Sequence, residues 1–553
     1  LVSVCLLLLA VILKVFYIQV FQYKKLNTLA NDLWSRQLPI TADRGLILDR
    51  NGKVLASNIT TTSLYIVPNQ VKNKETVAKD LADILGVSYE EMYRHVSKKT
   101  SIERVHPEGR QLSFEVADKI NSFNYDGVYL LKESKRYYPY DNLLAHVLGY
   151  VGIDNQGLSG LELEYDKFLT GTNGAIKYYS DAKGGRLSKT EEYVEAKSGN
   201  NVTLTIDLDL QLAVERELDN TVAKFNPNHA LAIAMDPNTG EVLAMASRPN
   251  YNPNSYQTYT QEVLSRNLPI WMTYEPGSTM KITTLAASLN ENIVNLFEDR
   301  FYDAGHVNVD GATIHCWKAG GHGDQSYLDV VANSCNPGFV NLGLKLGKEK
   351  LFEYINNFGF GKKTGIDLNG EAKGIMFNLD RVGNVELATT AFGQGVSVTP
   401  IQQVASVSAS VNGGTLYKPY IVSKVTTANN KDTLKSVEAT KVRTVIREDT
   451  SKLVRYALEN VVAHGSGRNA YIENYRVGGK TGTAQKVNNG SYMVGNYIVS
   501  FIGFMPADNP SIVLYVAVDN PKGIVQYGGT VAAPIAKSIL ESYIEIRNIP
   551  PTK

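Results

Sequence analysis

The stretch Tyr274-Glu275-Pro276-Gly277-Ser278-Thr279-Met280-Lys281 places a hydroxyl and an amine three residues apart, just after two residues that end the preceding structure. Ser278 is a typical helix N-cap, and the spacing from Lys281 to Leu289 predicts an amphipathic helix. Positions three apart share a helix face, so Lys281 can remove the Ser278 proton if burial or a second cation lowers the lysine pKa. The alternative is a capping serine followed by a solvated lysine.

Two more short motifs follow in the chain. The first, Ser334-Cys335-Asn336, precedes Pro337-Gly338, which places its polar side chains on a loop. The second, Lys480-Thr481-Gly482-Thr483, precedes two apolar strands, as a strand beside a cleft should. Similar short motifs recur at Ser180-x-x-Lys183 and Lys363-Thr-Gly365, in polar surroundings that make them poor candidates. The informative signal is therefore the ordered set of three, each with suitable local structure.

Length and composition indicate a globular protein of two or more domains, because the 553 residues are 43% hydrophobic and 20% charged. The formal net charge is +1, and the 56 basic and 55 acidic residues are interspersed. A nucleic-acid partner is not expected, because no basic patch is evident.

Residues 1–20 are almost wholly apolar, interrupted by Lys14 and Gln19. This length can cross a hydrocarbon layer of roughly 30 Å. Bulky residues at 15–18 argue against a cleaved signal peptide, so we expect an uncleaved anchor with Lys14 snorkelling or facing a partner helix. The sequence does not begin with Met, so the positive-inside rule is not applied.

The pattern after the anchor predicts two units. Residues 37–190 have short β-type runs and charged helical stretches, including a strand, an Asn51-Gly52 turn and a strand across residues 44–56. The Arg, Glu and His residues of 136–162 are expected to form ion pairs that fix the fold. From residue 200, strands at both ends with helices between them predict an α+β layer architecture. The predicted boundaries are the anchor 1–22, a pedestal 37–190, a second domain 200–546 and a tail 547–553.

The ordered trio resembles the penicillin-recognising serine transferases. Together with residues 44–56, 136–139, 157–162, 236–240 and 275–278, it is similar to class B penicillin-binding proteins, the D,D-transpeptidases of peptidoglycan synthesis, of the division or sporulation type. The resemblance implies an α+β transpeptidase domain, with an antiparallel sheet between helices. It also implies a preceding elongated, mainly β pedestal of the dimerisation type and one transmembrane helix.

The resemblance also implies a role for each motif residue. Ser278 would attack the penultimate D-alanine carbonyl of a stem peptide, with Lys281 as the base. Ser334 and Asn336 would shuttle a proton and hold the substrate amide, and Lys480 would depress the Lys281 pKa. The substrate-binding strand would be Thr481, Gly482 and Thr483, whose two hydroxyls bind the substrate carboxylate. The amides of Ser278 and Thr483 would form the oxyanion hole. β-Lactams would acylate Ser278, and neither a cofactor nor an active-site metal is implied.

A peptidoglycan substrate implies that the large C-terminal part is extracytoplasmic and held by a single-pass anchor. The family resemblance adds a membrane-embedded glycan polymerase and other cell-wall synthesis proteins as partners. Two other functions stay open: a β-lactamase, which needs an extra base for hydrolysis, and a non-catalytic scaffold or β-lactam sensor.

The three cysteines form no disulfide framework, because Cys5 lies in the anchor. Cys335 occupies the middle of the second motif and has three possible states. A disulfide to Cys316 would couple the motif to redox state, or both thiols could be buried and free. The third possibility is a zinc set of Cys316, Cys335 and either His322 or Asp324, although the spacing fits no standard finger.

Overall fold

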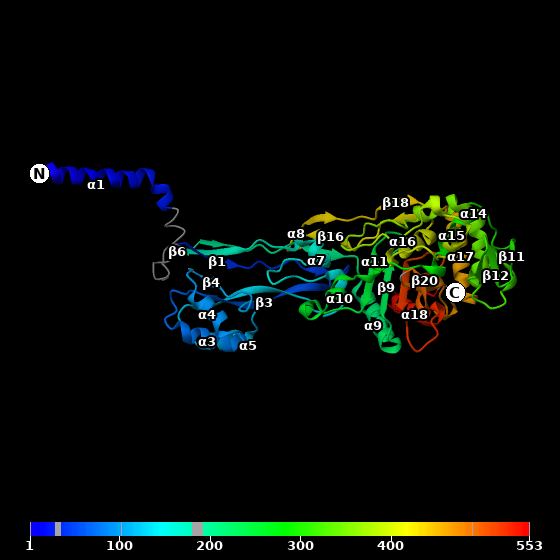
Figure 1. Ribbon diagram of the computed structural model, residues 1–553, viewed down its shortest axis with the longest axis horizontal. Helices are drawn as coiled ribbons and strands as arrows, with labels where there is room; N and C mark the ends of the chain where they lie inside the picture. The colour runs from blue at the N-terminus through cyan, green and yellow to red at the C-terminus, as the bar shows by residue number, and fades with distance from the viewer. Residues whose placement is uncertain (1, 28–34, 101, 180–191, 489, 552–553) are drawn as a thin grey trace.

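The structure is a computed structural model that describes residues 2–27, 35–100, 102–179, 192–488 and 490–551. Figure 1 shows an elongated molecule, with helix α1 at one end and the helices and small strands around α14 at the other. Helix α1 (Val2–Phe21) is 20 residues long, has a mean hydropathy of 2.6 and buries none of its side chains. It is long and apolar enough to cross a membrane.

The pedestal is built on a long antiparallel strand pair. Strand β3 (Val54–Ile66) pairs with β5 (Val128–Tyr137) from Ser57 opposite Tyr137 to Ile66 opposite Val128. The predicted hairpin is confirmed, because β2 (Ile47–Leu48) pairs antiparallel with β3 and Gly52 in the turn has φ +84°. The remaining pedestal elements are β4 (Glu103–Arg104), α3 (Lys74–Leu85), α4 (Tyr89–Ser97), α5 (Phe114–Ser122), α6 (Ala145–Leu148), α7 (Gly160–Glu164), α8 (Asp166–Leu169) and the three-stranded sheet of β1 (Ser35–Ile40), β6 (Gly174–Tyr179) and β7 (Glu192–Val194).

A buried ion network joins the pedestal segments. The carboxylate of Glu162, which is fully buried, accepts from Arg44 Nε at 2.5 Å and from Arg136 Nε at 2.6 Å. Arg136 Nη1 also donates to the Gly45 carbonyl at 2.7 Å. The expectation of ion pairs in this stretch is confirmed for Arg136 and Glu162, but not for His146, whose Nε2 lies 2.8 Å from the Val263 carbonyl.

Replacing Glu162 with Gln is expected to lower the free energy of unfolding by about 3–5 kcal/mol, because two buried guanidinium groups lose their shared counter-charge. Chemical denaturation of the full chain in detergent measures the loss. The matched control is Asp209→Asn, which breaks the exposed Lys53–Asp209 pair and should lower the free energy of unfolding far less, because solvent screens this pair. Equal losses in the two variants would contradict the assignment.

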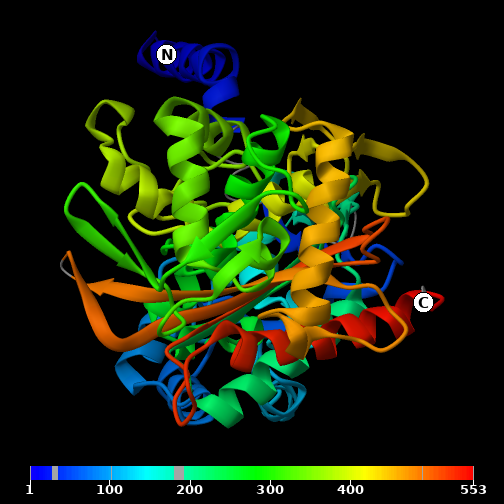
Figure 2. The same ribbon diagram turned by 90° about the vertical axis from the view of Figure 1, so that its right-hand side faces the viewer.

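The second part is organised on a five-stranded antiparallel sheet in the order β10-β9-β21-β20-β19. Its strands are β9 (His229–Met235), β10 (Val242–Arg248), β19 (Gly478–Asn488), β20 (Ser491–Met505) and β21 (Ile512–Asp519). Alternate residues enter two cores. Ala230 and Ala232 pack with α9 (Leu208–Phe225) and α18 (Gly528–Arg547), whereas Leu231 and Ile233 face the core around α12 (Lys281–Asn290) and α16 (Pro400–Val411). Figure 2 shows α18, in red, on one side of the orange strands and the green and yellow helices on the other. The predicted α+β layers are confirmed.

The other elements of this part cover the sheet or form its rim. They are η1 (Pro253–Thr258), α10 (Gln261–Ser265), α11 (Leu268–Trp271), η2 (Gly277–Thr279), β11 (Arg300–Asp303), β12 (His306–Val309), β13 (Ala312–His315), β14 (Gly323–Ser326), α13 (Tyr327–Ala332), α14 (Asn336–Asn357), η3 (Leu379–Arg381), α15 (Asn384–Ala391), β15 (Thr415–Tyr417), β18 (Lys441–Thr444), α17 (Glu448–His464) and η4 (Arg468–Ala470).

The two parts share one sheet. Strand β8 (Asn201–Leu204) pairs in parallel with pedestal strand β2 and antiparallel with β16 (Val422–Thr426), which also pairs with β17 (Thr433–Ser436). Strands from the predicted second domain therefore continue the sheet of the pedestal. The domain boundaries at 22, 37, 190, 200 and 546 stay a prediction. The shared sheet contains strands from both sides of the predicted boundary between residues 190 and 200.

Candidate active site

Ser278 lies in the short helix η2, directly before α12. Ser278 is not the predicted N-cap of α12. The N-cap position is occupied by Met280, whose side chain makes no capping hydrogen bond. The prediction of an amphipathic helix is also wrong, because Lys281 through Leu289 are all buried. The apparent polar face consists of Thr and Ser side chains that form hydrogen bonds inside the core. Thr284 Oγ1 donates to the Ala391 carbonyl at 2.8 Å and Ser288 Oγ donates to the Thr284 carbonyl at 2.9 Å.

Lys281 is the buried amine of the site, so the alternative of a solvated lysine is wrong. Its Nζ donates to the Ser334 carbonyl at 2.8 Å, to Asn336 Oδ1 at 2.7 Å and to Ser334 Oγ at 3.3 Å. Among the described residues, no hydrogen bond joins Lys281 to Ser278 Oγ. Burial lowers the pKa of Lys281 to about 7, against an opposing influence of Cys335 and Cys316. A lysine with this pKa is partly in its free-base form at neutral pH.

Ser334 lies between two amines. Lys480, fully buried on β19, donates from Nζ to Ser334 Oγ at 2.8 Å, on the same oxygen that Lys281 contacts. Burial and then the charge of Lys281 hold the pKa of Lys480 well below its usual value. Ser334 itself has φ +54°, a left-handed conformation that costs a non-glycine residue about 1–3 kcal/mol. The charge of Lys281 thus lowers the pKa of Lys480, whereas the low pKa of Lys281 itself comes from burial and not from the predicted effect of Lys480.

Asn336 does not lie on the predicted loop but begins helix α14, after Cys335 at the N-cap position. The proline that follows it suits the first helical turn, where its missing N–H has no acceptor to lose. The side chain of Asn336 accepts from Lys281 and donates from Nδ2 to the His315 carbonyl at 3.1 Å. Hydrogen bonds to Lys281 and to the His315 carbonyl therefore fix the position of the second motif.

Strand β19 is an edge strand of the sheet and carries the third motif. Thr481 Oγ1 donates to Ser466 Oγ at 3.3 Å, and Thr483 Oγ1 accepts from the Gly528 amide at 3.1 Å. Gly482 allows the strand to pack closely, because a Cβ there would lie 2.3 Å from Ser500 Oγ and 3.1 Å from Thr279 Cγ2. Glycine at this position therefore brings the strand against the helix that bears Ser278.

A cleft of about 730 Å³ unites the three motifs. Ser278, Ser334, Asn336, Thr481 and Thr483 line it, together with Gly277, His315, Trp317, Phe392, Gln394, Ser466, Asn469, Gln485, Tyr497, Tyr527, Gly528, Gly529 and Thr530. Lys281 and Lys480 do not line the cleft but are buried and bond to Ser334, which does. A volume in this range suits a small-molecule or peptide ligand.

Of the two motifs judged poor candidates, the structure describes only Lys363-Thr-Gly365, which does not line the cleft. Lys363 and Thr364 line a separate hollow of about 90 Å³, where the amides of Thr364 and Gly365 donate to Glu371. Ser180 lies outside the described residues.

Several lining residues were not found from the sequence. Trp317 is 57% exposed at the rim of the cleft, and its Nε1 donates to the Asn333 carbonyl at 2.8 Å. Glu275, next to the first motif but not among the residues that line the cleft, accepts from the Gly395 amide at 2.9 Å and from Tyr492 at 3.2 Å, and burial raises its pKa. The one sequence signal for Glu275 was its place next to the first motif; Trp317 had no signal beyond its neighbour Cys316.

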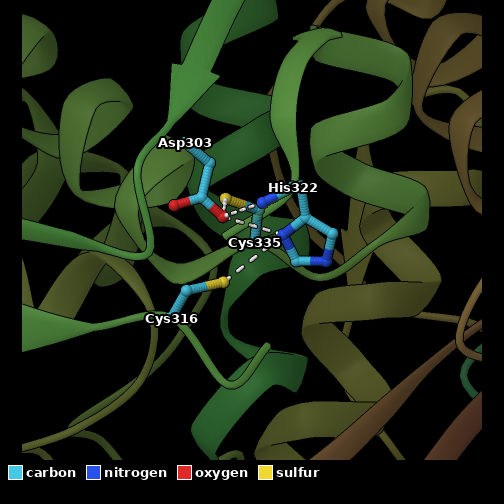
Figure 3. Close-up of side chains that lie close together, drawn as sticks. All are labelled: Asp303, Cys316, His322 and Cys335. Carbon is cyan, nitrogen blue, oxygen red and sulfur yellow. Dashed lines mark hydrogen bonds and ion pairs between the residues drawn. The ribbon is translucent and has the colours of Figure 1, made fainter. Parts of the chain in front are cut away.

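Cys316 and Cys335 are both buried and lie beside Asp303 and His322, as Figure 3 shows. Of the two residues offered as a third zinc ligand, His322 belongs to this cluster. Asp324 does not, because it pairs with Arg300 at 2.7 Å and is 60% exposed. Asp303 was missed, since a lone aspartate 13 residues before Cys316 fits no metal-binding spacing.

Comparisons with known proteins agree with this architecture. Residues 230–541 match the family model for the penicillin binding protein transpeptidase domain, and residues 39–204 match that for the penicillin-binding protein dimerisation domain. Stage V sporulation protein D of Bacillus subtilis is 56% identical over 538 residues, which cover 97% of this chain and 83% of that protein. Peptidoglycan D,D-transpeptidase FtsI of Escherichia coli K12 is 31% identical over 518 residues, which cover 93% of this chain and 85% of that protein.

Solved structures have the same fold. Penicillin binding protein 2X from Streptococcus thermophilus superposes with a TM-score of 0.76 at 24% identity, over 92% of this chain and 80% of that chain. A peptidoglycan synthetase from Bifidobacterium adolescentis gives a TM-score of 0.74 at 26% identity, over 94% of this chain and 98% of that chain.

The five-stranded sheet, the buried lysine of η2–α12 and the cleft along β19 define a penicillin-binding transpeptidase fold. With a dimerisation-type pedestal in front of that domain, the chain belongs to the class B penicillin-binding proteins.

Proposed function

We propose that this protein is a peptidoglycan D,D-transpeptidase that works through an acyl-enzyme on Ser278 and is covalently inhibited by β-lactams. The observation that carries the proposal is the Ser334 hydroxyl held between two buried lysines, at the wall of the cleft that exposes Ser278. The names of the relatives support the substrate, since one is a peptidoglycan D,D-transpeptidase and another a sporulation protein. The proposed role is cell-wall synthesis at the septum or the spore.

Acylation begins with the free base of Lys281. It takes the proton of Ser278, whose oxygen attacks the carbonyl carbon of the penultimate D-alanine. As the tetrahedral adduct collapses, the carbon–nitrogen bond breaks and the terminal D-alanine leaves. Its amine receives the proton through Ser334, which contacts both Lys281 and Lys480. An incoming amine from a neighbouring stem peptide then reverses these proton transfers and takes the acyl group.

Binding of the donor peptide relies on β19. We assign Thr481 and Thr483 to the substrate carboxylate because both line the cleft beside buried Lys480. The amides of Ser278 and Thr483 are assigned to the oxyanion hole. Ser278 lies in the first turn of a helix, where N–H groups have no intrahelical acceptor, and Thr483 lies on an edge strand. Loss of one such donor typically lowers the rate by ~10²–10³.

The proposal for the membrane arrangement rests on α1. We propose that α1 anchors the chain as a single pass, with the pedestal and transpeptidase parts on the outer side, where peptidoglycan is. Its side chains are all unburied, including Lys14, which lies 5.8 Å from the Tyr17 ring. A cation on an otherwise apolar helix favours a contact with another membrane protein, and we propose a glycan polymerase as that partner.

Intact-mass spectrometry of the full chain in detergent tests the proposed reaction. A short incubation with penicillin should give one adduct per chain, located on the peptide that contains Ser278, and the adduct should persist for hours. An adduct that disappears within seconds would indicate a β-lactamase, which removes the acyl group with an additional base. No adduct at any pH between 6 and 9 would indicate a non-catalytic scaffold.

A further inference from the structure

Four buried side chains that the proposed reaction does not use converge beside the cleft. They are Asp303 at the end of β11, Cys316 just after β13, His322 just before β14, and Cys335 at the start of α14. One ligand atom from each lies within 4.8 Å of all the others, and Figure 3 shows the four side chains directed toward one another. Two sulfurs, an imidazole and a carboxylate form a ligand set that zinc prefers.

The separations of these atoms are close to those of a tetrahedral site. Cys316 Sγ lies 3.4 Å from His322 Nδ1, and Cys335 Sγ lies 3.3 Å from Asp303 Oδ2. Zinc bound at ~2.3 Å to sulfur and ~2.0–2.2 Å to nitrogen or oxygen would place neighbouring ligand atoms ~3.3–3.8 Å apart. Asp303 Oδ2 and His322 Nδ1, now 2.8 Å apart, would have to separate by about half an ångström.

The backbone around the cluster holds the ligands in place. The Gly305 amide donates to Asp303 Oδ1 at 2.8 Å, which leaves Oδ2 directed at the sulfur and the imidazole. Gly321 has φ +76°, and a Cβ there would lie 2.2 Å from the Asp303 carbonyl, so glycine allows the turn before His322 to approach. The Trp317 ring packs edge-on against the His322 ring at 5.5 Å. Ligands fixed by such contacts are typical of built metal sites.

We propose that Asp303, Cys316, His322 and Cys335 bind one zinc ion, which fixes the Ser334-Cys335-Asn336 motif against the small strands of residues 300–326. Zinc binding releases the two thiol protons to solvent, so both sulfurs bind as thiolates. With four protein ligands the coordination sphere is closed, so the role is structural. The ion would hold the left-handed Ser334 beside the two lysines, and the four residues are positioning residues for the proposed acylation.

A disulfide between Cys316 and Cys335 is the competing state. It would use the two sulfurs alone, and it gives no reason for a buried carboxylate and a buried imidazole to contact one sulfur each. Two free thiols are the other competing state. In the geometry of the described residues, zinc accounts for all four side chains.

Metal analysis of the full chain, purified in detergent without reductant or chelator, is the first test. We expect one zinc per chain, thiols that are alkylated only after unfolding with a chelator, and, after exchange with cobalt, the visible absorption of a tetrahedral cobalt–thiolate site. A metal-free chain whose mass rises by two hydrogens on reduction would overturn the proposal in favour of the disulfide. A chain that stays metal-free after incubation with equimolar zinc and has reactive thiols would overturn it in favour of free thiols.

Variants locate the ion. Asp303→Asn should weaken zinc affinity by at least ~10-fold, whereas the matched control Asp324→Asn should retain one zinc, because Asp324 pairs with Arg300 at the surface. Should Asp303→Asn fail to fold, Cys316→Ser gives the same test. Equal zinc content in both aspartate variants and in Cys316→Ser would overturn the assignment.

The effect on acylation rests on the proposed function and has a separate readout. Chelation of the wild-type chain should slow penicillin acylation at least tenfold, and added zinc should restore it. One zinc per chain without any adduct on Ser278 would refute the proposed function and leave the metal site intact. Full-rate acylation after complete removal of zinc would overturn the positioning role.

Discussion

Replacing Ser278 by alanine is expected to abolish the covalent penicillin adduct, because Ser278 Oγ is the nucleophile of the proposed reaction and alanine has no oxygen to take its place. Ser334 Oγ is the nearest rival, but it already accepts from Lys480 at 2.8 Å and lies in a strained backbone. Loss of a nucleophile that acts as part of a unit removes nearly all covalent catalysis, about 10⁶-fold in a well-studied hydrolase. Intact mass after one hour with penicillin measures the loss.

The control for this variant is Ser288→Ala, on helix α12, which directly follows the short helix of Ser278. Ser288 is buried and donates to the Thr284 carbonyl one turn earlier, so its loss tests general damage to the helix. It should keep a full adduct. A normal adduct in the Ser278→Ala chain would end the proposal, whereas loss in both variants would point to a folding defect.

Replacing Lys281 by methionine is expected to slow penicillin acylation by roughly 10²–10⁴-fold, the usual contribution of a general base. Methionine is apolar and of similar length, so it should occupy the buried position without leaving a charge there. Stopped-flow or quenched mass spectrometry gives the acylation rate constant. Lys363→Met, in the other Lys-Thr-Gly segment, is exposed and lines a separate hollow, and it should acylate at the wild-type rate.

The pH profile distinguishes a base from a merely structural lysine. Burial lowers the Lys281 pKa to about 7, and the active species is the deprotonated amine. The wild-type rate should therefore rise with pH, reach a plateau above pH 7 and fall to about a tenth of the plateau at pH 6. The residual rate of Lys281→Met should lack this inflection. A profile that is flat from pH 6 to 9 in the wild-type chain would argue against Lys281 as the base.

The sequence predicted which residues meet in the cleft, because three short motifs in a fixed order are far more specific than any one of them. It also predicted the α+β layers and the pedestal hairpin, whose turn residues Asn51-Gly52 give a clear signal. It failed on α12, because Thr and Ser residues that satisfy their hydroxyls within the core give the same pattern as a solvated face.

Long-range packing could not be predicted. Asp303 meets Cys335 through the pairing of β11 with β14 and the turn at Gly321, and neither leaves a spacing rule in the sequence. The hydrogen-bond partners of Lys281 were also not predicted. The three-residue spacing on a helix suggested a contact between Lys281 and Ser278. Instead, Lys281 Nζ donates hydrogen bonds to Ser334 and Asn336, more than fifty residues later in the chain.

The sheet shared by pedestal and transpeptidase parts has a consequence for biosynthesis. Strand β2 at residues 47–48 pairs with β8, and β8 pairs with β16 at residues 422–426. A nascent chain that has emerged only as far as β8 therefore exposes an unpaired strand edge until most of the second part has been made. Unpaired edges recruit other strands, so premature truncation anywhere before β16 should yield aggregation-prone protein rather than a free-standing pedestal.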